Sequence, residues 1–256
     1  MPRYFIEVAY KGTNFKGFQI QERLNTIQGE INQALSILLK INIESTTSSR
    51  TDAGVHAYQN YLHDDCSHEN LAGLTYNLNA ILPYDIVIKN IIKVETDSHA
   101  RFDATSRSYV YFITQKKNPF IQESAYYYPF SLDIDLMNQG AAIFLKHQDF
   151  TSFSKKNTVV KTFICSLKNA YWQQNEDTLS FHVESNRFLR GMVRAMVATL
   201  LKLGRHKLTI AEFEQIIIQR DCVMADFSAV AKGLFLEKVN YPDHILNFTK
   251  KDEMSN

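Results

Sequence analysis

Hydrophobic and polar positions alternate at the start of the chain, then change period. Residues 3–10 place an apolar or aromatic side chain at every second position, and this period of two predicts a β-strand. Residues 26–40 repeat apolar side chains every three or four positions, which predicts a helix capped by Asn25 or Thr26. Further strands are expected at residues 41–43, 57–63 and 85–94. A second helix, capped by Ser67, is expected to end at Pro83.

The second half of the chain repeats this order of elements without repeating the sequence. Strands are expected at residues 107–114, 162–172, 178–185 and 233–239. Helices are expected at residues 136–146 and 187–203, and a third opens with the capping box of Thr209 and Glu212. The order β-α-β-β-α-β is the ferredoxin-like pattern. The sequence therefore predicts an α+β fold of two ferredoxin-like halves, residues 1–104 and 105–248, followed by a polar tail at 249–256.

Composition narrows the class of protein. The chain has 256 residues, of which 45% are hydrophobic and 21% charged, as in ordinary globular proteins. Its three cysteines lie far apart, which is typical of reduced thiols. No secretion signal opens the chain, and its longest apolar stretch is too short to cross a membrane, so a cytoplasmic protein without a membrane anchor is expected. No metal-binding spacing and no glycine-rich nucleotide motif is present, so we expect neither metal nor cofactor.

Charge is unevenly distributed along the chain. The net charge is only +1, which argues against a wholly basic nucleic-acid binder but not against a local basic surface. Residues 187–207 contain six basic and no acidic residues. Within the helix expected there, Arg187, Arg190 and Arg194 recur at spacings of three and four and would share one face. That face would either meet an anionic partner or simply be solvated.

The loop at residues 50–56 is the first candidate for chemistry. Asp52 lies there between two expected strands, and Arg50, two residues away, would help to keep its carboxylate ionised. The same residues could also form an ordinary turn. His56 could act as a base or could be a hydrogen-bonded residue at a strand edge. Tyr109 and Tyr111 could pack in the sheet or could stack on bases.

Several segments together resemble the tRNA pseudouridine synthase A family over nearly the whole chain. They are Ser-Ser-Arg-Thr-Asp-Ala-Gly-Val-His-Ala at 48–57, Gly-Phe-Gln at 17–19, the Asn-x-Asn and Leu-Pro-x-Asp-Ile residues of 77–86, His-Ala-Arg-Phe at 99–102 with Tyr109, Asp-Phe-Thr-Ser-Phe at 149–153, Phe-Leu-x-x-Met-Val-Arg at 188–194 and Gly-Leu-Phe-Leu at 233–236. Two positions depart from the family pattern, because Ser49 and Ala198 stand where the family usually has glycine.

The resemblance implies a reaction. A member of this family would convert uridine to pseudouridine in the anticodon stem-loop of tRNA, at positions 38 to 40, without cofactor or metal. The family is homodimeric. Its fold joins two ferredoxin-like halves in an extended, mainly antiparallel sheet, with helices on one side and the active-site cleft between the halves.

The resemblance also assigns roles to residues. Asp52 matches the catalytic aspartate and Arg50 the residue that assists base flipping. Arg194 matches the partner of the aspartate, Tyr109 the tyrosine that stacks on the base, and Leu234 an apolar residue of the uracil pocket. Contacts to RNA are expected from four basic residues: Arg101, Lys161, Arg190 and Lys202.

Three other functions compete with this interpretation. A non-catalytic RNA-binding module on the same fold would need the basic and aromatic residues but not Asp52 with Arg50 and Arg194. A ferredoxin-like enzyme with a small substrate would not need the basic stretch. A synthase of the same family could act at other positions of tRNA or on another RNA.

Overall fold

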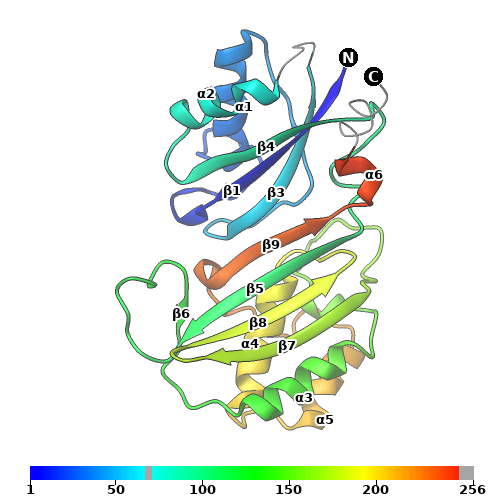
Figure 1. Ribbon diagram of the computed structural model, residues 1–256. Coiled ribbons are helices and arrows are strands. Elements are labelled where there is room, and N and C mark those ends of the chain that lie inside the picture. Colours follow the sequence, from blue (N-terminus) through cyan, green and yellow to red (C-terminus); the bar gives the residue numbers. More distant parts are fainter. Residues whose placement is uncertain (67–70, 248–256) are drawn as a thin grey trace. The chain divides into compact units, whose positions relative to one another are not determined.

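The computed structural model of the chain describes residues 1–66 and 71–247 (Figure 1). The chain forms two compact units. The first contains Met1–Ser106 and the chain from Leu236 onward, and the second contains Arg107–Phe235. Ser67, expected as a helix cap, and the expected tail at 249–256 lie outside the described residues.

The first unit is a small antiparallel sheet with helices. Its strands are β1 (Arg3–Tyr10), β2 (Thr46–Thr47), β3 (His56–Asp65) and β4 (Ile86–Val94), and its helices are α1 (Ile27–Leu39), α2 (Thr75–Ile81) and α6 (Asp243–Leu246). The strands lie in the order β4-β1-β3, and β2 pairs with the other edge of β3. With α1 after β1 and α2 before β4, this gives the β-α-β-β-α-β order expected from the sequence.

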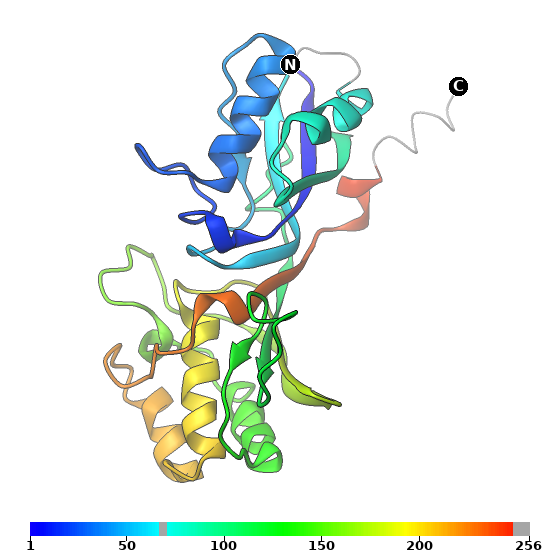
Figure 2. The ribbon, with the colours of Figure 1, turned by 90° about the vertical axis from the view of Figure 1, so that its left-hand side faces the viewer.

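Alternation along β1 separates the two faces of this sheet. Ile6 lies opposite Leu62, and both are fully buried. Helices α1 and α2 contact each other and lie on the viewer's side of the strands in Figure 2. Phe5 is on the opposite face with Tyr61, and both rings pack against Tyr241 at centroid distances of 5.3 and 5.2 Å. Both faces of β1 are therefore covered, which explains why its hydrophobic pattern is nearly continuous.

The second unit repeats the plan with a larger helical layer. Its strands are β5 (Ser106–Thr114), β6 (Tyr126–Tyr127), β7 (Leu167–Asn175) and β8 (Thr178–Ser185), and its helices are α3 (Ile134–Phe144), α4 (Met192–Gly204) and α5 (Ile210–Ile218). The strands run antiparallel in the order β5-β8-β7, while β6 is parallel to β5. Helix α4 crosses behind these strands in Figure 1. Four buried rings form the aromatic core of this unit: Phe144, Phe150, Phe153 and Phe213.

The last strand, β9 (Leu234–Asn240), begins in the second unit and continues into the first. Its residue Val239 donates its backbone N–H to Oε1 of Gln59 on β3, at 3.1 Å. The sequence assigned residues 105–248 to one half, but from Leu236 onward the chain packs with the first unit. A strand that closes one motif at the end of a chain can return to the other motif, and hydrophobic periodicity carries no information about which one it joins.

Helix ends follow the expected capping chemistry. The Thr26 hydroxyl accepts a hydrogen bond from the N–H of Gly29, so Thr26, and not Asn25, caps α1. The capping box of Thr209 and Glu212 is present at the start of α5. Both α+β class and mainly antiparallel strand pairing are confirmed.

Three expected elements differ. Helix α4 starts at Met192 and not at residue 187, because Gly191 has φ +75°, a left-handed conformation that interrupts the helix. Arg187 and Arg190 therefore precede the helix, and the expectation that they share one helical face with Arg194 is wrong. Residues 41–43 form no strand, since the short strand lies at 46–47. Strand β7 begins at residue 167 and not at 162.

The turn after β1 packs unusually close to the loop that precedes β3. A Cβ atom placed on Gly12 would lie 2.0 Å from the carbonyl oxygen of Val55. Only a residue without a side chain fits there, because the opposing atom belongs to the backbone and cannot rotate away.

We therefore expect Gly12→Ala to lower the free energy of unfolding by about 1–3 kcal/mol through overpacking. Gly29→Ala in α1 is the control, because its Cβ would meet side-chain atoms of Thr26 and Ile20 and no backbone, and alanine favours a helix. Urea unfolding followed by circular dichroism measures both. Equal stability of the Gly12 variant and the wild type would contradict the close packing.

Candidate active site

Asp52 occupies a tight turn in the loop between β2 and β3. The N–H of Val55 donates to the carbonyl oxygen of Asp52 at 3.1 Å, and Gly54 has φ +77°, as such turns require. Asp52 itself is half-buried, whereas Thr51 and Val55 are buried. The turn thus fixes the backbone on both sides of the carboxylate.

Residues that follow β1 hold this turn from one side. The Tyr10 hydroxyl lies 2.8 Å from Oγ1 of Thr51, and the N–H of Phe18 donates to the carbonyl oxygen of Thr51 at 3.1 Å. The N–H of Gly12 donates to Nδ1 of His56 at 3.1 Å. His56 is 1% exposed. It is therefore a buried, hydrogen-bonded residue that supports the loop, and this environment favours the structural role over that of a base. Sequence analysis did not identify Tyr10 or Gly12 as supports, because their partners lie about forty positions away.

Ser49 carries the one departure from the family pattern in this loop. Its carbonyl oxygen accepts a hydrogen bond from Nδ2 of Asn60 at 2.9 Å. Its hydroxyl is buried and has no hydrogen-bond partner among the described residues. A glycine here would leave no such hydroxyl, so the substitution adds a buried polar group without adding a bond.

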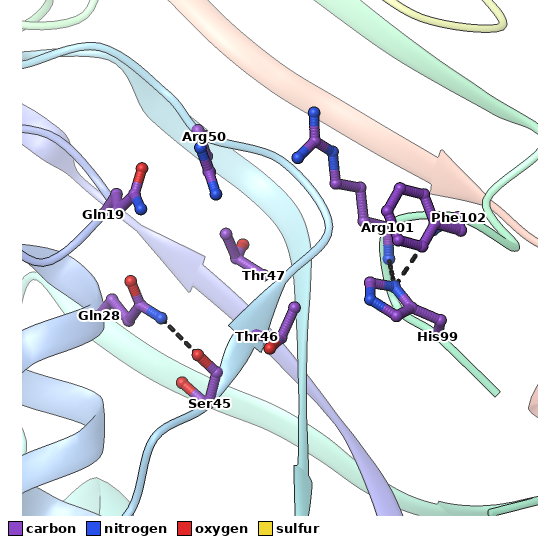
Figure 3. A pocket seen from close by; sticks show the side chains of 9 residues that line it. All are labelled: Gln19, Gln28, Ser45, Thr46, Thr47, Arg50, His99, Arg101 and Phe102. Carbon is purple, nitrogen blue, oxygen red and sulfur yellow. Dashed lines mark hydrogen bonds between the residues drawn. The ribbon is translucent and has the colours of Figure 1, made fainter. Parts of the chain in front are cut away.

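A polar pocket of about 260 Å³ lies in the first unit beside this loop. One part of its wall comes from the segment before α1, the first turn of α1, and β2 with the residue before it: Gln19, Gln28, Ser45, Thr46 and Thr47. The other part is formed by Arg50, His99, Arg101 and Phe102 (Figure 3). Two expected site residues, Arg50 and Arg101, are therefore brought to one pocket, and both are exposed.

The segment at 99–103 is held by an array of hydrogen bonds to side chains. Nδ1 of His99 accepts from the N–H groups of Arg101 and Phe102, at 3.1 and 3.3 Å. The N–H of His99 donates to Oδ2 of Asp103 at 2.6 Å. The N–H of Ala100 donates at 3.1 Å to Nδ1 of His63 on β3. The backbone of this loop is consequently fixed at the three residues that line the pocket, His99, Arg101 and Phe102.

Both histidines must be unprotonated at Nδ1 to accept these bonds. Burial, together with the nearby His99 and Arg3, lowers the pKa of His63 to about 4, against the opposing effect of Asp65 and Asp103. Burial likewise lowers the pKa of His99. Their rings meet edge to face at 4.6 Å. At neutral pH the loop is therefore tied to the sheet by neutral acceptors.

In the second unit, the segment at 229–234 is positioned by β5 and α4. Nε of Arg194, in the first turn of α4, donates to the carbonyl oxygen of Ala229 at 2.6 Å. The Tyr111 hydroxyl donates to the carbonyl oxygen of Val230 at 2.7 Å. Leu234 follows at the start of β9 and is 6% exposed. Arg194 and Leu234 are therefore linked through this segment. The sequence does not indicate this link, because the two residues lie far apart along the chain.

The two tyrosines of β5 differ in environment. Tyr111 is fully buried, and burial raises its pKa well above the usual range, so it belongs to the packed core. Tyr109 is half-buried and its ring meets Phe188 edge to face at 5.1 Å. Only Tyr109 of the pair keeps a partly exposed ring, the environment that stacking on a base requires.

The expected RNA contacts are spread over the second unit, apart from Arg101. Lys202 forms an ion pair with Asp226 at 2.9 Å. Arg190 and Lys161 are exposed, and the carbonyl oxygen of Arg190 accepts from the N–H of Lys155. Lys202 thus also anchors the segment around Asp226, a structural role that the charge pattern did not predict.

Within residues 1–66 and 71–247 there is no group of three or more His, Cys, Asp or Glu side chains placed to hold a metal ion. No helix in these ranges is long and apolar enough to cross a membrane.

Comparison with known proteins gives consistent matches. A family model described as tRNA pseudouridine synthase matches residues 141–242. The tRNA pseudouridine synthase A of Parabacteroides distasonis is 44% identical over 247 residues, which cover 96% of this chain and 98% of that protein. The enzyme of the same name from Bacteroides thetaiotaomicron is 44% identical over 262 residues, covering 100% and 97%. That from Bacteroides fragilis is 44% identical and covers 95% and 98%.

The neutral histidine under the 99–103 loop predicts a pH-dependent stability. The folded chain keeps the pKa of His63 below its ordinary value, so the unfolded chain binds a proton first as the pH falls. The stabilisation is present above about pH 6.5 and is lost as the pH falls through about 4.

His63→Asn keeps an acceptor for the N–H of Ala100 and removes the titrating group, so stability should fall less between pH 6.5 and 4 than in the wild type. Urea unfolding at pH 7, 5.5 and 4 measures this, with the exposed His244→Asn as the control. An identical pH dependence in wild type and His63→Asn would rule out the proposed titration.

Proposed function

The chain belongs to the tRNA pseudouridine synthase A family and is an isomerase that converts uridine to pseudouridine in tRNA; we propose that Asp52 is its catalytic residue. The reaction breaks the bond between C1′ and N1 of a uridine, turns the uracil and joins C5 to C1′. No group is imported, and the hydrogen on C5 is released. A single ionised carboxylate can serve such a reaction as nucleophile or base.

The observation that carries this proposal is the construction of the Asp52 turn. Its backbone is fixed by the Val55–Asp52 hydrogen bond and by the contacts of Tyr10 and Phe18 to Thr51. The side chain at the centre stays half-exposed. A turn needed only to join two strands would not require support from a separate segment, whereas a reacting carboxylate must be held at a defined position.

Arg50, two residues before Asp52 in the same loop, assists the flipping of the same uridine. Positions 38 to 40 lie in or beside the anticodon stem, and a paired target base must leave the helix, which costs on the order of a few kcal/mol. Arg50 is exposed and two residues from Asp52. A guanidinium there would occupy the space left by the base and contact the adjacent phosphates.

Residues of the second unit complete the chemistry. Arg194 has five N–H donors, and its Nε donates to the carbonyl oxygen of Ala229. The planar guanidinium suits a carboxylate, so Arg194 would keep Asp52 ionised. Tyr109 would stack on the uracil, and Leu234 would give that base an apolar contact. The contacts described for the segment at 229–234 support this assignment, because they place Arg194 and Leu234 on one framework.

The substrate is the anticodon stem-loop, and the active form is a homodimer. Arg101, Lys161, Arg190 and Lys202 would bind phosphates of the tRNA. These four residues belong to separate segments, and the net charge of the whole chain is only +1. Basic residues spread in this way suit a large substrate that is bound at several points.

The central experiment is tritium release from tRNA that carries [5-³H]uridine. The wild type should release tritium, and Asp52→Asn should reduce release on the order of 10³-fold or more, because a nearly isosteric amide cannot replace the carboxylate. Binding of tRNA should be nearly unchanged. Asp135→Asn, at an exposed position in the first turn of α3, is the matched control and should retain full activity. Full turnover by Asp52→Asn would overturn the catalytic assignment.

Arg190→Ala should weaken tRNA binding and reduce the slope of log K against log salt by about one, because one phosphate contact is lost. Lys202→Ala should do the same, with an additional loss of stability since Asp226 then lacks its partner. Filter binding at several salt concentrations measures the slope. Lys168→Ala on β7, whose lysine pairs with Glu184, is the control. A slope unchanged from that of the wild type would remove the substituted residue from the contact surface.

A further inference from the structure

We propose that the pocket lined by Arg50, Arg101 and Phe102 binds one nucleotide of the tRNA that flanks the modified uridine. Its phosphate would lie between the two guanidinium groups and its base against the Phe102 ring. This inference rests on the proposed function, because it takes tRNA as the substrate and Asp52 as the reacting group.

The charge of the pocket favours an anion. Two arginines reach it from different segments, Arg50 from the loop before β3 and Arg101 from the 99–103 loop (Figure 3). None of the residues described as lining it is acidic. His99 adds no opposing charge, since it accepts hydrogen bonds as a neutral ring. Paired guanidinium groups without a carboxylate are typical of phosphate recognition.

Some polar side chains of the pocket wall are already hydrogen-bonded within the protein. Others are exposed on the wall, where they could form hydrogen bonds with a ligand. Gln28 is already bonded within the protein, because its Oε1 accepts from the N–H of Ile20 and its Nε2 donates to the carbonyl oxygen of Ser45. Gln19 and Thr46 are exposed side chains on the same wall. An amide and a hydroxyl at these places suit the hydroxyl groups of a ribose.

Phe102 supplies a surface for a base. Its side chain is 74% exposed although it is a large apolar ring. One side is supported by His99, with ring centroids 4.2 Å apart, and the Arg101 guanidinium lies 5.8 Å from its centroid. An exposed aromatic ring beside a cation is the usual platform on which an unpaired base stacks.

The loop that carries these groups is preorganised. Four backbone N–H groups, those of residues 99–102, donate to His63, His99 or Asp103. Little conformational entropy remains to be lost when a ligand binds, so the contacts of Arg101 and Phe102 contribute fully to affinity.

Size and location define which nucleotide is bound. A cavity of about 260 Å³ is too small for a base pair and suits a single nucleotide. Arg50 lines the pocket and is two residues from Asp52, so the bound nucleotide is a near neighbour of the uridine that reacts. The pocket would thereby set which uridine of the stem-loop reaches the carboxylate.

The test is a double-mutant cycle between Phe102 and the RNA. Fluorescein-labelled anticodon stem-loops carry an abasic site at each nucleotide flanking the target uridine in turn, and fluorescence anisotropy gives the dissociation constant. Phe102→Ala should weaken binding of the intact stem-loop about tenfold, as expected for one lost base stack. The loss should vanish for the stem-loop that lacks the one stacked base. Phe102→Tyr should bind like the wild type.

Tyr76→Ala is the matched control, because Tyr76 is an aromatic residue of the same unit, 83% exposed on α2 and outside the pocket. It should not change binding. Equal binding by Phe102→Ala and the wild type, or the same loss with every abasic stem-loop, would overturn the proposal.

Tritium release by the same variants separates this inference from the proposed function. Release by the wild type with no effect of Phe102→Ala on binding would overturn only the pocket. In another outcome, binding depends on Phe102 and on one particular base, but the wild type releases no tritium. This result would support the pocket and overturn the assigned reaction.

Discussion

The close approach of the chain after β1 to the loop before β3 is the constraint on which the first unit depends. Gly12 touches the carbonyl of Val55, and its N–H bonds to His56. Because backbone meets backbone, the distance between the two segments cannot adjust to changes in side chains. The turn between Thr51 and Val55 is therefore set by the sheet itself, since one supporting segment continues β1 and the other leads into β3. Rigid elements hold a reacting group more accurately than a free loop does.

In the second unit, side chains rather than backbone contacts hold the segment that precedes β9. Arg194 and Tyr111 each bond one carbonyl of the segment before β9, and the ring of Tyr111 packs against Gly233. Arg194 is thus a structural residue in addition to the role proposed for it in the reaction. Its replacement would release the segment that ends in Leu234, so lost activity in such a variant would mix two effects. In the turn of Asp52, by contrast, the bond from Val55 is accepted by the backbone carbonyl of the aspartate.

Sequence patterns predicted strands and helices well where one face is buried. Strand β1 and the hairpin strand β8 were predicted at their observed bounds, and the capping box of Thr209 marked α5 correctly. The helix predicted from residue 187 failed because Gly191 lies within an otherwise helical pattern but adopts a left-handed conformation. A Cβ at this position would also meet the side chain of Lys155. The family motifs are the basis on which Asp52 and Arg194 are proposed as site residues. They did not identify His63 or Tyr10, whose roles arise from hydrogen bonds to residues 37 and 41 positions away.

The histidines under the 99–103 loop illustrate how a loop proposed to bind RNA can be rigid and cationic at once. Such a loop must satisfy its own backbone N–H groups, yet each carboxylate used as an acceptor would offset the positive charge that attracts phosphate. A neutral imidazole accepts a hydrogen bond without adding charge. Here His63 and His99 take three of the four N–H groups and Asp103 takes only the first, at the end farthest along the chain from Phe102. Burial keeps both rings neutral near pH 7, because it lowers the pKa of each. The loop can therefore be held firmly by acceptors that add little negative charge beside Arg101.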